Sequence, residues 1–190
     1  MLKRFSFIFA IFAFAFSCHH ESNLPKLFPV PNAKLVTDSG KPMQLDAMKG
    51  YVTVYDFIFT NCAGTCPMMT ATMRRLTAAI DKSQPVRFVS ISVDSTRDTP
   101  AVLRQYALRV RNDDRWLFLT GDSDTIVRLS VDGFKLAAGG SSSSVVEPLL
   151  HSSKLVVADK RGMIRDYYGA TNDDTVDHVS SVVHDLVREN

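Results

Sequence analysis

The sequence predicts an α/β fold in which helices cover both faces of a central sheet, forming a three-layer sandwich. Tyr51–Thr60 is a run of mainly β-branched and aromatic residues, which is typical of a strand buried on both faces, and Val86–Val93 is predicted as the next buried strand. A segment with helical signals follows each run, so strands and helices alternate. The chain then ends in a predicted hairpin and a helix, which completes this α/β pattern.

The first half of the predicted domain begins with a β-hairpin. Lys34–Thr37 and Pro42–Leu45 flank Asp38-Ser39-Gly40, a sequence typical of a tight turn. After the strand Tyr51–Thr60, Pro67 opens a helix that runs to about Lys82. This helix carries one apolar stripe, made of Met69, Met73, Leu76 and Ile80.

The second half continues the alternation. Thr99 and Pro100 combine an N-cap with proline at the first helical position. The predicted elements after Val86–Val93 are, in chain order, a helix from Thr99 to about Val110, the strand Trp116–Leu119, a helix capped by Asp122 or Ser123 and running to about Val131, a hairpin of Ser153–Ala158 and Met163–Tyr168, and a last helix capped by Asn172.

Composition limits the classes of function. The chain has 190 residues, of which 45% are hydrophobic and 22% charged, and this fits one domain with a sizeable core. Lys3 and Arg4 are the only charged residues among the first 18, so the remainder has 20 basic and 20 acidic residues. A body without net charge or a basic run argues against nucleic acid as a partner.

The first 18 residues predict export. Lys3 and Arg4 precede Phe5–Phe16, where eleven of twelve residues are apolar, as in a secretory signal. Ser17-Cys18 resembles the end of a bacterial lipobox, so we expect lipidation at Cys18. Cleavage after Ala13-Phe14-Ala15 is the alternative. Either route predicts export to the extracytoplasmic face of the bacterial inner membrane, where a lipid, or this segment if it stays uncleaved, would anchor the protein.

The rest of the chain divides into a linker and a domain. We assign residues 19–31, which contain three prolines, to an extended linker and residues 32–190 to the domain. Cys62 and Cys66 are the domain's only cysteines, and they lie between a predicted strand and a predicted helix. The N-terminus of a helix lowers the pKa of a nearby thiol.

Two thiols in this position predict either redox chemistry or a soft metal ion, Cu(I) or Zn²⁺. Two cysteines alone leave a metal ion under-coordinated, so a metal site here needs a third ligand.

Four segments resemble blocks of the SCO/SenC family, copper proteins with a thioredoxin fold. The similarity covers residues 30–188, and the blocks occur in the family's order. The segments are Tyr55–Asn61 followed by Cys62-x-x-x-Cys66-Pro67-Met68-Met69, Phe88–Asp94 with Arg97-Asp98-Thr99-Pro100, Trp116–Gly121, and His151-Ser152.

The resemblance implies that Cys62, Cys66 and His151 bind one copper ion, Cu(I) or Cu(II). It implies delivery of that copper to the binuclear copper centre of cytochrome c oxidase subunit II, by a transfer protein rather than a turnover enzyme. Other copper chaperones or thiol reductants are then further partners. Leu150 stands where the family usually has an Asp before the histidine, which leaves this imidazole without a neighbouring carboxylate from that position.

The main alternative is a thiol–disulfide reductase that acts on the cysteines of that copper centre or on other exported proteins. Cys62 would attack and Cys66 would resolve the mixed disulfide. Asp56 lies six residues before Cys62 and has two interpretations, a proton acceptor for the second thiol or a hydrogen-bonded structural acid. Met69 is assigned to the core, whereas Met68 is a free thioether beside the thiols.

Overall fold

The structure, a computed structural model, describes residues 21–136 and 152–189. Within them a seven-stranded sheet has the order β2-β1-β5-β4-β3-β6-β7. The strands are β1 Lys34–Thr37, β2 Pro42–Gln44, β3 Val52–Ile58, β4 Val86–Ser92, β5 Trp116–Thr120, β6 Lys154–Ala158 and β7 Ile164–Gly169. The helical segments are the 3₁₀ turn η1 Leu45–Met48, α1 Cys66–Ala79, α2 Pro100–Val110, α3 Ser123–Arg128, the π-helical turn η2 Leu129–Gly133 and α5 Thr175–Arg188.

The centre of the sheet is formed by the two strands that the sequence predicts to be buried. β3 pairs with β4 in parallel, from Val52 opposite Val86 to Ile58 opposite Ser92, and every residue of β3 is buried. β5 extends the parallel part, whereas β6 pairs with β3 in the antiparallel direction. The carboxyl ends of β3 and β4 therefore meet at one edge of the sheet, where open α/β sheets place their sites.

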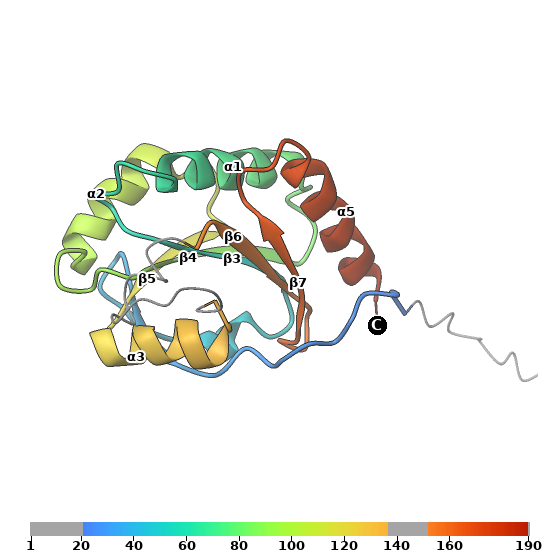
Figure 1. Cartoon of the computed structure of the whole chain (residues 1–190), viewed down its shortest axis with the longest axis horizontal. Coiled ribbons are helices and arrows are strands. Elements are labelled where there is room, and N and C mark those ends of the chain that lie inside the picture. Colours follow the sequence, from blue (N-terminus) through green and yellow to red (C-terminus); the bar gives the residue numbers. More distant parts are fainter. Residues whose placement is uncertain (1–20, 137–151, 190) are drawn as a thin grey trace, which may run out of the picture.

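Helices lie on both faces of the sheet, so the predicted three-layer sandwich is confirmed (Figure 1). α1, α2 and α5 cover one face, and the predicted stripe of α1 is buried there with Met69 and Met73 in the core. α3 and η2 cover the other face, where the ring of Phe134 packs edge-on against Tyr55 and Phe57. The predicted N-terminal hairpin is β1–β2, which joins the sheet through β1 and β5.

The described part of the predicted linker is extended, but it is also docked on the domain. Backbone hydrogen bonds join Leu27 and Phe28 to Ile164 at 2.9 and 2.7 Å. Arg165 then fixes the segment, because its buried guanidinium donates to the carbonyls of Leu24 and Pro25 and to the hydroxyl of Ser22. The same guanidinium pairs with two buried carboxylates, Asp159 and Glu189.

Two local predictions are wrong. Asn172 does not cap the last helix, which begins at Thr175, because the Thr175 hydroxyl bonds to the carbonyls of Gly169 and Asn172 and so delays the first turn. The helix predicted to run to Val131 changes to a π turn after Arg128. There the hydroxyl of Ser130 bonds to the carbonyls of Ile126 and Val127, a local contact that competes with regular α-helical bonding.

None of the helices formed by residues 21–136 and 152–189 is long and apolar enough to cross a bilayer.

Candidate metal and thiol site

Both domain cysteines lie where β3 gives way to α1. β3 ends at Ile58, two residues earlier than predicted, and Cys66 is the first residue of α1, followed by Pro67. The residue before the helix, Thr65, makes no side-chain capping bond. The free N–H groups of the first turn are thus available to the sulfur of Cys62, as the sequence predicts for this position.

The two thiols differ in burial and in acidity. Partial burial raises the pKa of Cys62, but hydrogen bonds from the Cys66 thiol and from the N–H groups of Cys66, Gly64 and Thr65 outweigh burial and lower it. Cys66 is 4% exposed, and burial, its bond to Cys62 and the charges of Cys62 and Asp56 raise its pKa to about 12. Cys62 is therefore the more acidic thiol of the pair, and Cys66 holds its proton more tightly.

Asp56 lies on β3 and is completely buried. Its Oδ1 accepts a hydrogen bond of 2.5 Å from the Ser90 hydroxyl, which in turn accepts 2.9 Å from the indole N–H of Trp116. Oδ2 has no partner among the described residues. Burial raises the pKa of Asp56 to about 7, against the effect of the Ser90 bond. The structural interpretation accounts for Oδ1, and the unpaired Oδ2 leaves the interpretation as a proton acceptor open.

Asp98 is a site residue to which the sequence analysis assigned no role beyond its place in a family block. It is 1% exposed, and its carboxylate accepts hydrogen bonds from the backbone N–H of Thr60 at 2.9 Å and from the hydroxyls of Thr60 and Ser92 at 2.5 Å each. It thereby fixes the start of the thiol loop to the end of β4. One feature of the sequence could have indicated this role. Asp98 directly precedes Thr99, which caps α2, so the acid is not needed as a cap itself.

A pocket of about 300 Å³ opens beside both sulfurs, between α1 and α2. Its walls include Cys62, Cys66, Arg74 and Tyr106, and the Tyr106 hydroxyl is 2.7 Å from that of Thr70 on α1. Its lining residues are Phe59, Thr60, Cys62, Cys66, Pro67, Thr70, Ala71, Arg74, Tyr106 and Val110. The pocket lies against both thiols, of which Cys62 is the more exposed.

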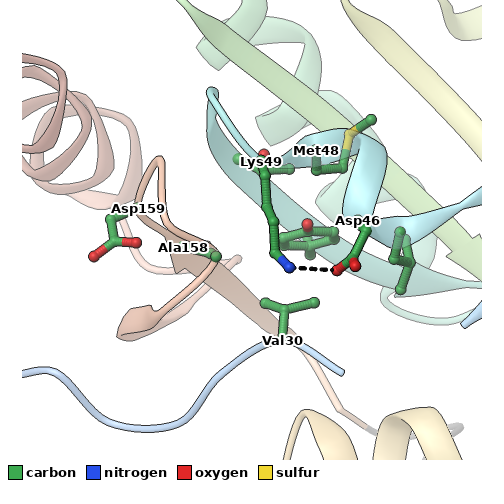
Figure 2. Close-up of a pocket in the computed structure, with 10 residues that line it drawn as sticks. Val30, Asp46, Met48, Lys49, Ala158 and Asp159 are labelled. Carbon is green, nitrogen blue, oxygen red and sulfur yellow. Dashed lines mark ion pairs between the residues drawn. The ribbon is translucent and has the colours of Figure 1, made fainter. Parts of the chain in front are cut away.

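A second hollow has no comparable room. Figure 2 shows Lys49 reaching towards Asp46, with which it pairs at 2.9 Å, above Val30. The space inside is about 10 Å³, enough for about one water molecule. We therefore assign no ligand to it.

The remaining predicted residues separate into those inside and outside the described ranges. Met69 is buried, as predicted, and Met68 is 53% exposed on α1. Cys18, Leu150 and His151 lie outside residues 21–136 and 152–189. Within these ranges no three residues of the types His, Cys, Asp and Glu are grouped as metal ligands. The two sulfurs suit a soft ion, and its third ligand has to come from elsewhere.

Comparisons with known proteins agree on one family. The SCO1/SenC family model matches residues 30–188. The SCO1 protein homolog of Bacillus subtilis is 32% identical over 177 residues, which are 90% of this chain and 91% of the relative.

Solved structures show the same fold. A SCO1/SenC family lipoprotein from Bacillus anthracis has a TM-score of 0.73 at 28% identity, over 84% of this chain and 95% of its own. BsSco also has a TM-score of 0.73 at 28% identity, over 87% of this chain and 96% of its own. It is described as a member of the Sco family of cytochrome c oxidase assembly proteins and as containing a disulfide switch. Yeast Sco1 with copper bound has a TM-score of 0.63 at 22% identity, over 84% and 94%, a likeness that concerns the fold alone.

Proposed function

This chain belongs to the SCO1/SenC family, and we propose from that premise that it is a copper metallochaperone that delivers copper to the binuclear copper site of cytochrome c oxidase subunit II. Proteins of the Sco family bind copper and take part in cytochrome c oxidase assembly. The observation that carries the proposal for this chain is the pair Cys62 and Cys66, two soft donors at the start of α1 that line one pocket.

In the proposed site Cys62, Cys66 and His151 hold one copper ion. Thiolates are soft ligands, which select Cu(I) over hard cations. Cys62 is poised to bind first because its thiolate is already favoured, whereas Cys66 releases its proton when the metal binds. His151 completes the set as the third ligand that two cysteines require.

Anaerobic titration of the reduced protein with Cu(I) tests this proposal. We expect one ion per chain, with two sulfurs and one nitrogen in its X-ray absorption spectrum. Cys62→Ser and Cys66→Ser abolish binding, and His151→Ala removes the nitrogen and weakens it. His184→Ala is the matched control, because His184 is an exposed histidine of α5. Binding that is unchanged in His151→Ala contradicts the assignment of the third ligand.

A thiol–disulfide reductase is the second candidate, and the unequal thiols favour it. The Cys62 thiolate attacks a disulfide of the target and displaces one of its sulfurs as a thiolate. Cys66 then attacks Cys62, which releases the second target thiol and leaves a Cys62–Cys66 disulfide. Asp56 is buried near Cys66 and has an unpaired oxygen, so it is a candidate to accept the Cys66 proton. His151→Ala separates the two functions, since reductase activity needs no histidine ligand.

We further propose that the protein is exported and held at the extracytoplasmic face of the membrane, either by a lipid on Cys18 or by the apolar N-terminal segment. The lipoprotein from Bacillus anthracis supports this arrangement. Mass spectrometry of protein from the membrane fraction tests it. A lipid-sized mass increase that is lost in Cys18→Ala supports lipidation, and an unmodified N-terminus at residue 1 contradicts it.

A further inference from the structure

The two helices beside the thiols carry charge of one sign. α1 and α2 contain no acidic residue, but they contain Arg74, Arg75, Arg104 and Arg109, all exposed. Among residues 21–136 and 152–189, none of these four takes part in an ion pair. The domain as a whole has as many acids as bases, so this cationic face reflects an uneven distribution of charge.

Two of the arginines border the pocket at the thiols. Arg74 lines it directly, and the guanidinium of Arg109 lies 5.8 Å from the ring centre of Tyr106, which is another lining residue. Tyr106 is held to α1 by its bond with Thr70, so the two helices form a fixed groove. The groove therefore has Cys62, Cys66 and Arg74 in its lining, and Arg109 lies beside its Tyr106 wall.

The same two helices also carry exposed apolar side chains. Met68, Val102 and Leu108 are exposed by 53, 42 and 68%, and all three lie on α1 or α2. Exposed apolar side chains with arginines around them are typical of a surface that another protein covers.

We propose that the groove between α1 and α2 docks an acidic, cysteine-bearing segment of the protein that exchanges copper or thiols with Cys62, and that Arg74 and Arg109 select its carboxylates. The inference rests on the proposed function, since it describes the partner of that same site. Charge complementarity of this kind raises the rate of association and rejects partners of the wrong sign.

The helix geometry gives the spacing of the partner's charge. The Cys66 thiol is hydrogen-bonded to the attacking sulfur of Cys62, and Arg74 follows Cys66 by eight residues, which is about 12 Å along an α-helix. An extended segment advances about 3.3 Å per residue, so its carboxylate belongs about four residues from its reacting cysteine.

Short peptides activated as 2-pyridyl disulfides test the proposal without a known partner. The Cys62 thiolate attacks the peptide sulfur, a bond forms between these two sulfurs, and pyridine-2-thiolate leaves and takes a proton from the buffer. Cys66 then displaces the peptide thiol and forms a disulfide with Cys62. Two protein thiols are oxidised and the starting disulfide is reduced to two thiols, and the release of pyridine-2-thione is followed by absorbance.

Three peptides of equal length carry Asp, Asn or Lys four residues from a central cysteine on either side. At low ionic strength we expect the wild-type protein to react about 10-fold faster with the Asp peptide than with the Lys peptide, a preference that about 1 M salt removes. Arg74→Gln and Arg109→Gln each reduce it to about 3-fold, and the double variant shows none. Arg188→Gln is the matched control and keeps it, because Arg188 is an exposed arginine at the far end of α5.

Equal rates for the three peptides with the wild-type protein overturn the proposal, as does a preference that survives in the double variant. Copper titration of the same variants separates this outcome from failure of the proposed function. We expect the double variant to lose its preference for the Asp peptide but still to bind one copper ion. A wild-type protein that binds no copper but prefers the Asp peptide refutes only the metallochaperone.

Discussion

Replacement of Asp56 by Asn is expected to change how the stability of the reduced, copper-free protein depends on pH. The folded protein holds the Asp56 proton up to about pH 7, because burial raises its pKa from 3.8. The unfolded chain releases the same proton near pH 4. Stability from this group is therefore complete below about pH 4 and is lost as the pH rises through 7.

The size of the effect follows from the two pKa values. Each pH unit by which folding raises the pKa of an acid costs about 1.4 kcal/mol once the pH exceeds both values. Asp56 thus destabilises the folded state by about 4 kcal/mol at pH 8 relative to pH 4. Asn does not titrate and so has no such cost. Its amide N–H group would occupy the position of Oδ2, which has no hydrogen-bond partner, and this unsatisfied donor lowers the free energy of unfolding by about 1–3 kcal/mol at every pH. Asp56→Asn is then more stable than the wild type at pH 8 by about 1–3 kcal/mol and less stable at pH 4.

Urea denaturation at a series of pH values between 4 and 8 measures this difference. Other acids contribute equally to both proteins, so only the difference between variant and wild type is compared. Asp173→Asn is the control, an exposed acid in the turn before α5, and its curve is expected to follow the wild type. A constant difference between Asp56→Asn and the wild type across the range refutes the assignment of a raised pKa. If Asp56 also accepts the Cys66 proton, the stabilised variant closes the Cys62–Cys66 disulfide more slowly, a trade of activity for stability.

The remaining predictions concern the thiols, the loop and the N-terminal segment. Iodoacetamide is expected to alkylate Cys62 at least about 10-fold faster than Cys66 at neutral pH, and peptide mass mapping that finds equal rates contradicts the inequality of the thiols. Asp98→Asn is expected to weaken copper binding by about 10-fold in a competition titration, since it loosens the thiol loop at Thr60, and an unchanged affinity shows that the loop needs no such support. Arg165→Met is expected to lower the free energy of unfolding by about 3 kcal/mol, because two buried carboxylates lose their partner, and to expose residues 22–30 to proteases. Proteolysis at the wild-type rate argues against a role of Arg165 in fixing that segment.

The local pattern of the sequence is sufficient for most of the fold. β3 and β4 are recognisable because a strand buried on both faces is mostly apolar, and α2 because Thr99 and Pro100 mark its start. Cys62 and Cys66 are recognisable as a site because they fall between a strand and a helix. These features depend on residues that are neighbours in the chain.

The features that were missed depend on contacts between distant residues. Asp98 holds Thr60, which lies 38 positions away, and Arg165 bonds to Ser22 and Leu24 across more than 140 positions. A buried charge whose partners come mostly from remote segments has no local pattern, since its neighbours in sequence do not reveal what surrounds it. Asn172 was misassigned for a different reason, because the start of α5 is decided by a short-range bond from Thr175 back to Gly169, six residues earlier.

The attachment of the N-terminal segment has a consequence for transfer. Ile164, where this segment pairs with β7, lies level with the start of β3, because Ile164 pairs with Ala158 and Ala158 with Thr53. Cys66 follows the other end of β3, so the segment joins the domain at the sheet end opposite the thiols (Figure 1). A membrane anchor on this segment would hold the domain from the end remote from the thiols. The groove between α1 and α2 then remains free for a partner, which is the arrangement that a protein handing over copper requires.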